Sequence, residues 1–126
     1  MPDEIAAVKD DNQRPIPSAW RPVILNIVDA FVRHDYQLAA GVPGVAPVPA
    51  NTAMQIEGYI ERYGETLVPL PDDTWNTSVC MWTGHHWDVL VDLWTVGEGG
   101  SDLVLGLAVI DSGDDYVVDI QMVYVP

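Results

Sequence analysis

The feature that most constrains this fold is an alternation of apolar and polar residues that starts near Trp75. It is clearest in GHHWDVLVDLWTVGEGGSDLVL, residues 84–105. A period of two is typical of strands with one buried face. The short turns TGH, GEGG and SGDD indicate antiparallel neighbours, because parallel strands need long crossovers. We therefore predict four strands, at about 75–82, 86–96, 102–111 and 116–125.

The alternation also divides the strand residues between two faces. A register that sets Leu93 opposite Leu103, and Leu105 opposite Ile120, aligns all the apolar sets. A slip of one residue would set leucines opposite aspartates, so this register should be strongly preferred. The apolar face predicted in this way contains Trp87, Val89, Val91, Leu93, Leu103, Leu105, Leu107, Val109, Val118, Ile120 and Met122.

The opposite face is mixed, and Gly106 and Ala108 should leave a shallow dent in it. Its aspartates cannot enter a dry core without partners, because burying an unpaired charge is very costly. A half-wet surface that contacts another protein fits better. The predicted mixed face contains Asp88, Leu90, Asp92, Trp94, Val104, Gly106, Ala108, Asp119, Gln121 and Val123, with Asp102 beside Trp94 across the hairpin.

The first strand has two possible registers. A three-residue turn would place Trp82, Cys80 and Ser78 on the mixed face, near His86 and Asp88. A two-residue turn would place the same three side chains in the core. The sequence leaves both alternatives open.

Two helices should precede the strands. Ser18 is a suitable N-cap for the first, which should end between His34 and Leu38. The Gly- and Pro-rich segment 40–50 favours a loop. Thr52 and Gln55 fit a capping box for the second helix, and Gly64 supplies its end.

These elements predict an α+β fold with two N-terminal helices packed on one face of a four- to five-stranded antiparallel meander. Residues 1–17 are expected to be a flexible lead, and residues 18–126 a single domain. The segment ETLVPLPDD, residues 65–73, holds too many prolines for a central strand but could form an edge strand.

The net charge of the chain limits the classes of molecule that it can bind. Five Lys and Arg residues stand against 19 Asp and Glu residues, which gives a net charge of −14. Such a field repels nucleic acid and anionic membranes, and it attracts basic proteins. Solubility alone is the other explanation of the acidity. The polar N-terminal sequence has no signal-peptide pattern, and one cysteine allows no internal disulfide, so we expect a cytoplasmic protein.

These residues could form several catalytic or metal sites, but each has a simpler structural explanation. Cys80, His86 and Asp88 could form a thiol–base–carboxylate group, but a strand cysteine is usually core filler. His86, Asp88 and Asp92 could bind a metal, but a solvated hairpin end is the simpler explanation. No phosphate- or dinucleotide-binding motif is present. We therefore predict no catalytic residue, no metal and no cofactor.

The phrases TWNTSVCMW, HWDVLVDLWT, EGGSDL and VYVP resemble an uncharacterised family of small bacterial proteins, from about Trp20 to Pro126. The resemblance implies a turn reading Glu-Gly-Arg-Ser-Asp, in which Gly100 stands at the position of the arginine. It brings no catalytic residues. The segment AFVRHDYQLAA followed by a meander also resembles the opening of cystatin-like rolls of the NTF2 class, which implies a bent sheet around a helix.

The leading hypothesis is a non-enzymatic acidic module that binds a protein partner, such as an immunity or inhibitor protein that neutralises a basic toxin. A homodimer through the mixed face is compatible with it. The alternative is an NTF2-like ligand pocket or enzyme near His86 and Asp88, and its pocket residues would be Trp82 and His86. The predicted binding surface consists of Asp88, Leu90, Asp92, Trp94, Asp102 and Asp119.

Overall fold

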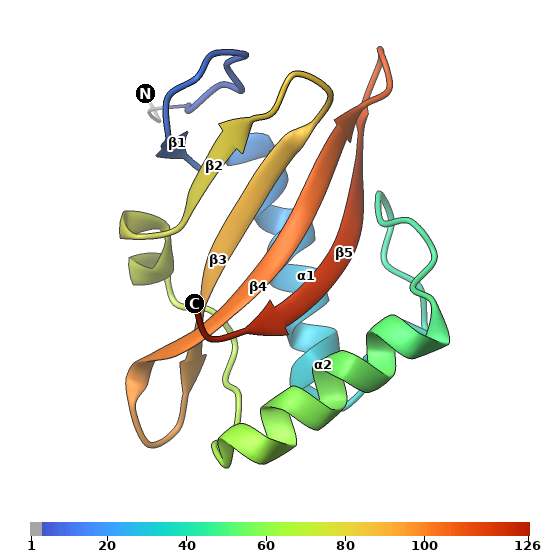
Figure 1. Ribbon diagram of the computed structural model, residues 1–126, viewed down its shortest axis with the longest axis vertical. Coiled ribbons are helices and arrows are strands. Elements are labelled where there is room, and N and C mark those ends of the chain that lie inside the picture. Colours follow the sequence, from blue (N-terminus) through green and yellow to red (C-terminus); the bar gives the residue numbers. More distant parts are fainter. Residues whose placement is uncertain (1–3) are drawn as a thin grey trace.

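The alternating C-terminal half forms the predicted meander, and two helices precede it (Figure 1). The structure is a computed structural model that describes residues 4–126. It confirms the predicted α+β class: two α-helices and a five-stranded antiparallel sheet in the order β1-β2-β3-β4-β5. The elements are β1 (Arg14–Pro15), the 3₁₀ helix η1 (Ser18–Trp20), α1 (Arg21–Val32), α2 (Ala50–Tyr63), the 3₁₀ helix η2 (Asp72–Asn76), β2 (Val79–Trp82), β3 (Trp87–Thr95), β4 (Gly99–Asp111) and β5 (Tyr116–Tyr124).

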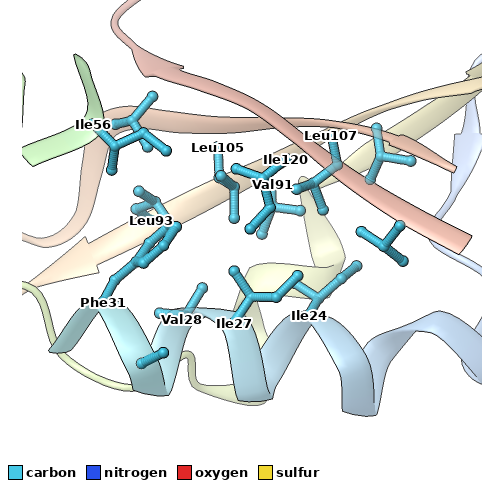
Figure 2. Close-up of a cluster of buried hydrophobic side chains, with 14 of the residues drawn as sticks. Ile24, Ile27, Val28, Phe31, Ile56, Val91, Leu93, Leu105, Leu107 and Ile120 are labelled. Atoms are coloured by element: carbon cyan, nitrogen blue, oxygen red, sulfur yellow. The ribbon is translucent and has the colours of Figure 1, made fainter. Parts of the chain in front are cut away.

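The core lies between α1 and one face of the sheet, and Ile56 of α2 joins it (Figure 2). Ile24, Ile27 and Phe31 point from α1 toward the strands at helical spacing, and each is fully or almost fully buried. In Figure 1, α1 lies behind β3, β4 and β5, which leaves the opposite face of the sheet uncovered by a helix. We call that face the open face.

The β3–β4 register agrees with the sequence prediction over most of its length. Trp87 pairs with Val109, and Asp92 pairs with Val104. Beyond Asp92 the register shifts, and Trp94 lies opposite Gly100.

The predicted β4–β5 register was wrong. Leu105 lies opposite Val123, and Ile120 lies opposite Leu107. A bulge gives β5 one extra residue, Gln121, because Gly106 pairs with Met122. A bulge reverses which face the following residues occupy. Val123 therefore lies in the core at 0% exposure, whereas Met122 lies on the open face at 42%, the reverse of the prediction.

Strand β2 takes the register that places Cys80 in the core. The β2–β3 loop has four residues, 83–86, and Trp82 pairs with Trp87. A loop of four residues assigns the β2 side chains to the same faces as the two-residue turn considered above, because the side chains alternate with a period of two. Cys80 pairs with Val89 and is buried, and its thiol donates a hydrogen bond to the Pro15 carbonyl at 3.6 Å.

Both predicted N-terminal caps were wrong. The Ser18 hydroxyl accepts a hydrogen bond from the Ile5 N–H, and α1 starts later, with Pro22 in its first turn. Helix α2 begins after Pro49 without a side-chain cap. Its predicted end is confirmed, because Gly64 adopts a left-handed conformation with φ of 86°.

The fifth strand does not come from the segment predicted for it. Residues 65–73 contribute only the isolated bridge between Leu67 and Thr95. The fifth strand is β1, which pairs with β2 and lies within the predicted lead. From Glu4 onward this lead contacts the rest of the protein, and Ile16 is fully buried. Trp75, predicted at the start of a strand, lies in η2.

The outer edge of β5 is covered by a side chain and a loop, and not by another strand. The Gln55 amide donates to the Val123 carbonyl at 2.8 Å and accepts from the Val123 N–H at 3.2 Å. Val118 exchanges two backbone bonds with Gly44 and Ala46 in the loop before α2. Unpaired strand edges invite another chain to add a strand. Gln55 thus occupies the place of a neighbouring strand at the bulge.

We expect Gln55→Ala to destabilise the protein by about 1–3 kcal/mol, because it leaves both backbone groups of the buried Val123 unpaired. Urea unfolding would measure the change. Gln121→Ala is the matched control, since Gln121 is exposed and bonds only to Asp119. Equal losses for the two variants would contradict this role of Gln55.

The Cys80 thiol should be unreactive in the folded protein. Burial raises its pKa from 9.0 to about 11, so the reactive thiolate is rare at neutral pH. Alkylation by iodoacetamide at pH 7.5 should be about 100-fold slower than that of an unperturbed thiol, and it should reach the ordinary rate in urea. Fast alkylation of the folded protein would overturn this expectation.

Candidate functional site

A groove crosses the open face of the sheet, between β2 and β5. Its volume is about 350 Å³. Leu90 and Gly106 lie at its centre, on neighbouring strands that pair at these two residues. Gly106 keeps the floor low, because a Cβ there would lie 3.6 Å from Met122 Cγ and would fill part of the space. The lining residues on the open face are Gln13, Val79, Met81, Asp88, Leu90, Gly106, Gln121, Met122 and Tyr124.

The walls of the groove are apolar and adaptable. Met81 is 43% exposed and Met122 is 42% exposed. Methionine side chains are flexible and polarisable, and they are frequent on surfaces that accept varied partners. Two large apolar side chains exposed on opposite walls of a groove are typical of a surface that contacts another molecule.

Within the described residues, no Lys or Arg side chain pairs with the aspartates on this face. Within residues 4–126, Lys and Arg form ion pairs only as Lys9–Asp111 and Arg14–Asp10. Asp88 contacts the His86 ring at 3.0 Å, Asp92 accepts a hydrogen bond from Thr77, and Asp119 accepts one from Gln121 at 3.0 Å. The open face therefore combines an apolar groove with negative charge that no Lys or Arg neutralises.

The predicted surface residues divide between this groove and the far end of the sheet. Asp88 and Leu90 line the groove, and Asp119 lies on the same face opposite Ala108. Asp92 is tied to η2 and to the residues just after it: its carbonyl accepts from Thr74 in η2, and its N–H donates to Ser78. The structure therefore brings together only part of the predicted set.

Trp94 and Asp102 lie near the β3–β4 turn, away from the groove. The Trp94 ring packs over Gly99 and Gly100 and is half-buried. A side chain at Gly100, where the family resemblance implies an arginine, would lie against this ring, since a Cβ there would be 3.6 Å from Cζ2. Trp94 lies directly opposite Gly100, two residues before Asp102, and the Asp102 N–H donates to the Tyr63 hydroxyl at the end of α2, at 3.2 Å.

The alternative pocket is not assembled in the structure. His86 is in the β2–β3 loop and does not line the groove, although its partner Asp88 does. Trp82 faces the opposite side of the sheet, where its ring is 4.6 Å from that of Trp87. Trp82 and Asp88, both predicted near the NTF2-like pocket, thus lie on different sides of the sheet.

The β2 register also separates the other chemical groupings drawn from the sequence. Cys80 faces the core, whereas Asp88 faces the groove, so no thiol–base–carboxylate group forms. Among residues 4–126, no three His, Cys, Asp or Glu side chains lie close enough to hold a metal ion. Within the same residues, no helix has both the length and the apolar character of a membrane span.

Sequence reasoning missed several residues of the groove. Met122 and Tyr124 reach the open face through the β5 bulge, and Met81 and Val79 reach it because the β2–β3 loop has four residues. Gln13 comes from the predicted lead. The loop is one residue longer than the predicted turn TGH, because His86 also belongs to it. No local signal in the sequence marks the bulge.

One comparison with known proteins gives a match. A family model described as Domain of unknown function (DUF7668) matches residues 28–126. No curated protein and no solved structure matches the chain. The match begins inside α1 and includes α2, η2 and strands β2 to β5, and therefore most of the groove. Because the match spans far more than half of its residues, the chain belongs to the DUF7668 family, a domain of unknown function.

Proposed function

We propose that this protein binds a basic, amphipathic segment of another protein in the groove of its open face. The observation that carries the proposal is the pairing of an apolar groove with aspartates that have no Lys or Arg partner. An apolar side chain of the partner enters between Met81 and Met122. Its Lys or Arg side chains meet Asp88 and Asp119 at the margins.

Charge favours a basic partner over a second copy of this chain. Two open faces pressed together would bring Asp88, Asp92 and Asp119 of both copies into one interface. Like charges at an interface cost several kcal/mol. A basic segment instead gains from the same aspartates, and the net charge of −14 attracts it from a distance.

The dimensions of the groove set the kind of contact. A volume of about 350 Å³ is at the lower end for ligand pockets and fits one or two side chains. Interfaces often depend on such an anchor in a pocket surrounded by weaker contacts. The groove therefore supports a protein segment better than an enclosed small molecule. The most specific form of the proposal is an inhibitor or immunity protein for a basic toxin.

The methionines provide a matched pair of variants. Met122→Lys adds a positive charge inside the groove, and Met54→Lys adds the same charge on α2, where Met54 is 71% exposed. The probe is a synthetic decapeptide of alternating Leu and Lys, with binding followed by fluorescence anisotropy. Met122→Lys should weaken binding about tenfold or more, and Met54→Lys should have little effect. Equal effects of the two variants would rule out the groove as the site.

Association should also depend on salt if the aspartates steer the partner. The on-rate should fall roughly tenfold as ionic strength rises from about 0.01 to about 0.5 M, while the off-rate changes much less. Asp88→Asn and Asp119→Asn should slow association, and Asp114→Asn, in the exposed β4–β5 turn, is the control. Stopped-flow measurements would show this. An on-rate that does not respond to salt would return the acidity to a role in solubility.

A further inference from the structure

A cluster of aromatic rings lies on the other side of the sheet from the groove. The Trp87 ring is its centre, 5.2 Å from Trp20, 4.6 Å from Trp82 and 5.9 Å from Tyr116 between ring centroids. Trp87 is 1% exposed, whereas Trp82 is half-buried. A face of Trp82 is therefore available to a side chain that comes from outside the core.

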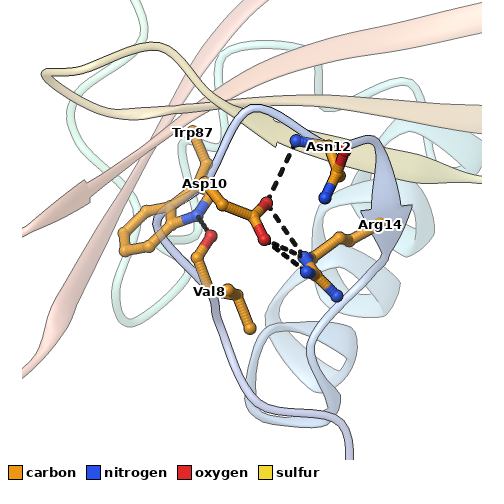
Figure 3. Close-up of polar contacts among 5 residues, drawn as sticks. All are labelled: Val8, Asp10, Asn12, Arg14 and Trp87. Carbon is orange, nitrogen blue, oxygen red and sulfur yellow. Dashed lines mark hydrogen bonds and ion pairs between the residues drawn. The ribbon is translucent and has the colours of Figure 1, made fainter.

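The N-terminal segment lies over this cluster. Lys9 Nζ is 4.9 Å from the Trp82 ring centroid and 5.7 Å from that of Trp87, and it forms an ion pair with Asp111 at 3.2 Å. The backbone beside it is also held, because the Trp87 indole N–H donates to the Val8 carbonyl at 3.0 Å (Figure 3). The pKa of Asp111 is lowered by the Gly113 N–H and by Lys9, so this carboxyl group is ionised at neutral pH.

Two indole faces and a carboxylate are the groups that recognise an alkylammonium ion, since both attract the charge and the rings also contact the alkyl stem. We propose that Trp82, Trp87 and Asp111 form a site for a lysine side chain, filled in cis by Lys9, from which a lysine of another basic chain displaces it. The site is distinct from the groove and uses other residues. The inference therefore goes beyond the proposed function and does not need it.

The contacts of the Lys9 side chain are those of a displaceable occupant. The Lys9 side chain is 51% exposed, and exposed cation–π and ion-pair contacts are weak. A cavity of about 370 Å³ lies between residues 4–7 and the Trp20 and Tyr116 side chains. The buried Trp20 indole N–H has no hydrogen-bond partner within residues 4–126. The Lys9 side chain can thus leave the rings while the backbone of the segment stays in place, held by the hydrogen bonds of Val8 and Ile5.

The Trp87 indole N–H already donates to the Val8 carbonyl, so the site takes only the side chain of an incoming lysine. Nα-acetyl-lysine N-methylamide presents that side chain between two peptide groups. Its norleucine counterpart has a similar shape without the ammonium, and it is the matched control ligand.

Lys9 is the only lysine in the chain, which gives a specific probe. Reductive ¹³C-methylation of the full-length protein labels this side chain and keeps its charge; the α-amino group gives a separate signal. The Lys9 methyl resonance should be shifted by the ring current of Trp82. Addition of the lysine amide should move it toward the position of a free methylated lysine, and the norleucine amide should not.

A second measurement removes the occupant. Lys9→Ala should bind the lysine amide about tenfold more tightly than the unaltered protein, because no cis competitor remains. Lys9→Arg keeps a cation in place and should bind like the unaltered protein, while Asp111→Asn should bind more weakly. Met122→Lys should have no effect, which separates this site from the groove. The proposal is overturned if the lysine amide fails to move the Lys9 resonance, or if Lys9→Ala and Lys9→Arg bind it equally.

Discussion

The packing of α1 against β3, β4 and β5 determines which face of the sheet is buried and which is left open. Ile24, Ile27 and Phe31 pack on one face of the sheet and are buried there together with Leu93 and Leu105. Burial of such side chains is the main source of folding free energy. The described chain has two α-helices, and both contribute to the core on this one face of the sheet. The other face must therefore meet solvent or a second protein. Its composition, which combines two exposed methionines with three aspartates, suits contact with a basic protein.

The two edges of the sheet restrict association in a complementary way. At β5, the Gln55 side chain and the loop before α2 satisfy backbone groups that would otherwise recruit a strand. At the other edge, β1 consists of two residues, one of which is Pro15, and proline cannot donate a ladder hydrogen bond. Strand addition is thus blocked at β1 and along much of β5. Under the proposed function, the partner therefore contacts a face of side chains, and selectivity comes from shape and charge and not from backbone pairing.

The sequence predicts those parts of the fold that depend on local periodicity. The alternation from Trp87 onward, and the helical spacing of Ile24, Ile27 and Phe31, correctly identify the strands and the buried face of α1. The bulge at Gln121 cannot be read in this way, because it depends on Val123 meeting both the core and the Gln55 amide. Ser18 and Thr52 look like caps locally, yet Ser18 binds a residue 13 positions away. The aspartates of the groove were therefore predictable, whereas its methionine walls and its Gln13 margin required the three-dimensional structure.

The few positive charges of this chain explain why its two candidate sites differ. Lys9 and Arg14 pair with Asp111 and Asp10, while Arg21 and Arg62 lie over the rings of Trp75 and Tyr59. Each of these four cations is thus held by the chain itself, away from the open face. At the aromatic site, the cation that a partner would bring is already supplied by Lys9. On the open face, no Lys or Arg within residues 4–126 pairs with the aspartates, and under the proposed function the partner supplies that cation. A basic chain would fill the groove directly, but it would have to compete for the aromatic site, so occupation of the two sites would occur at different concentrations of the same partner.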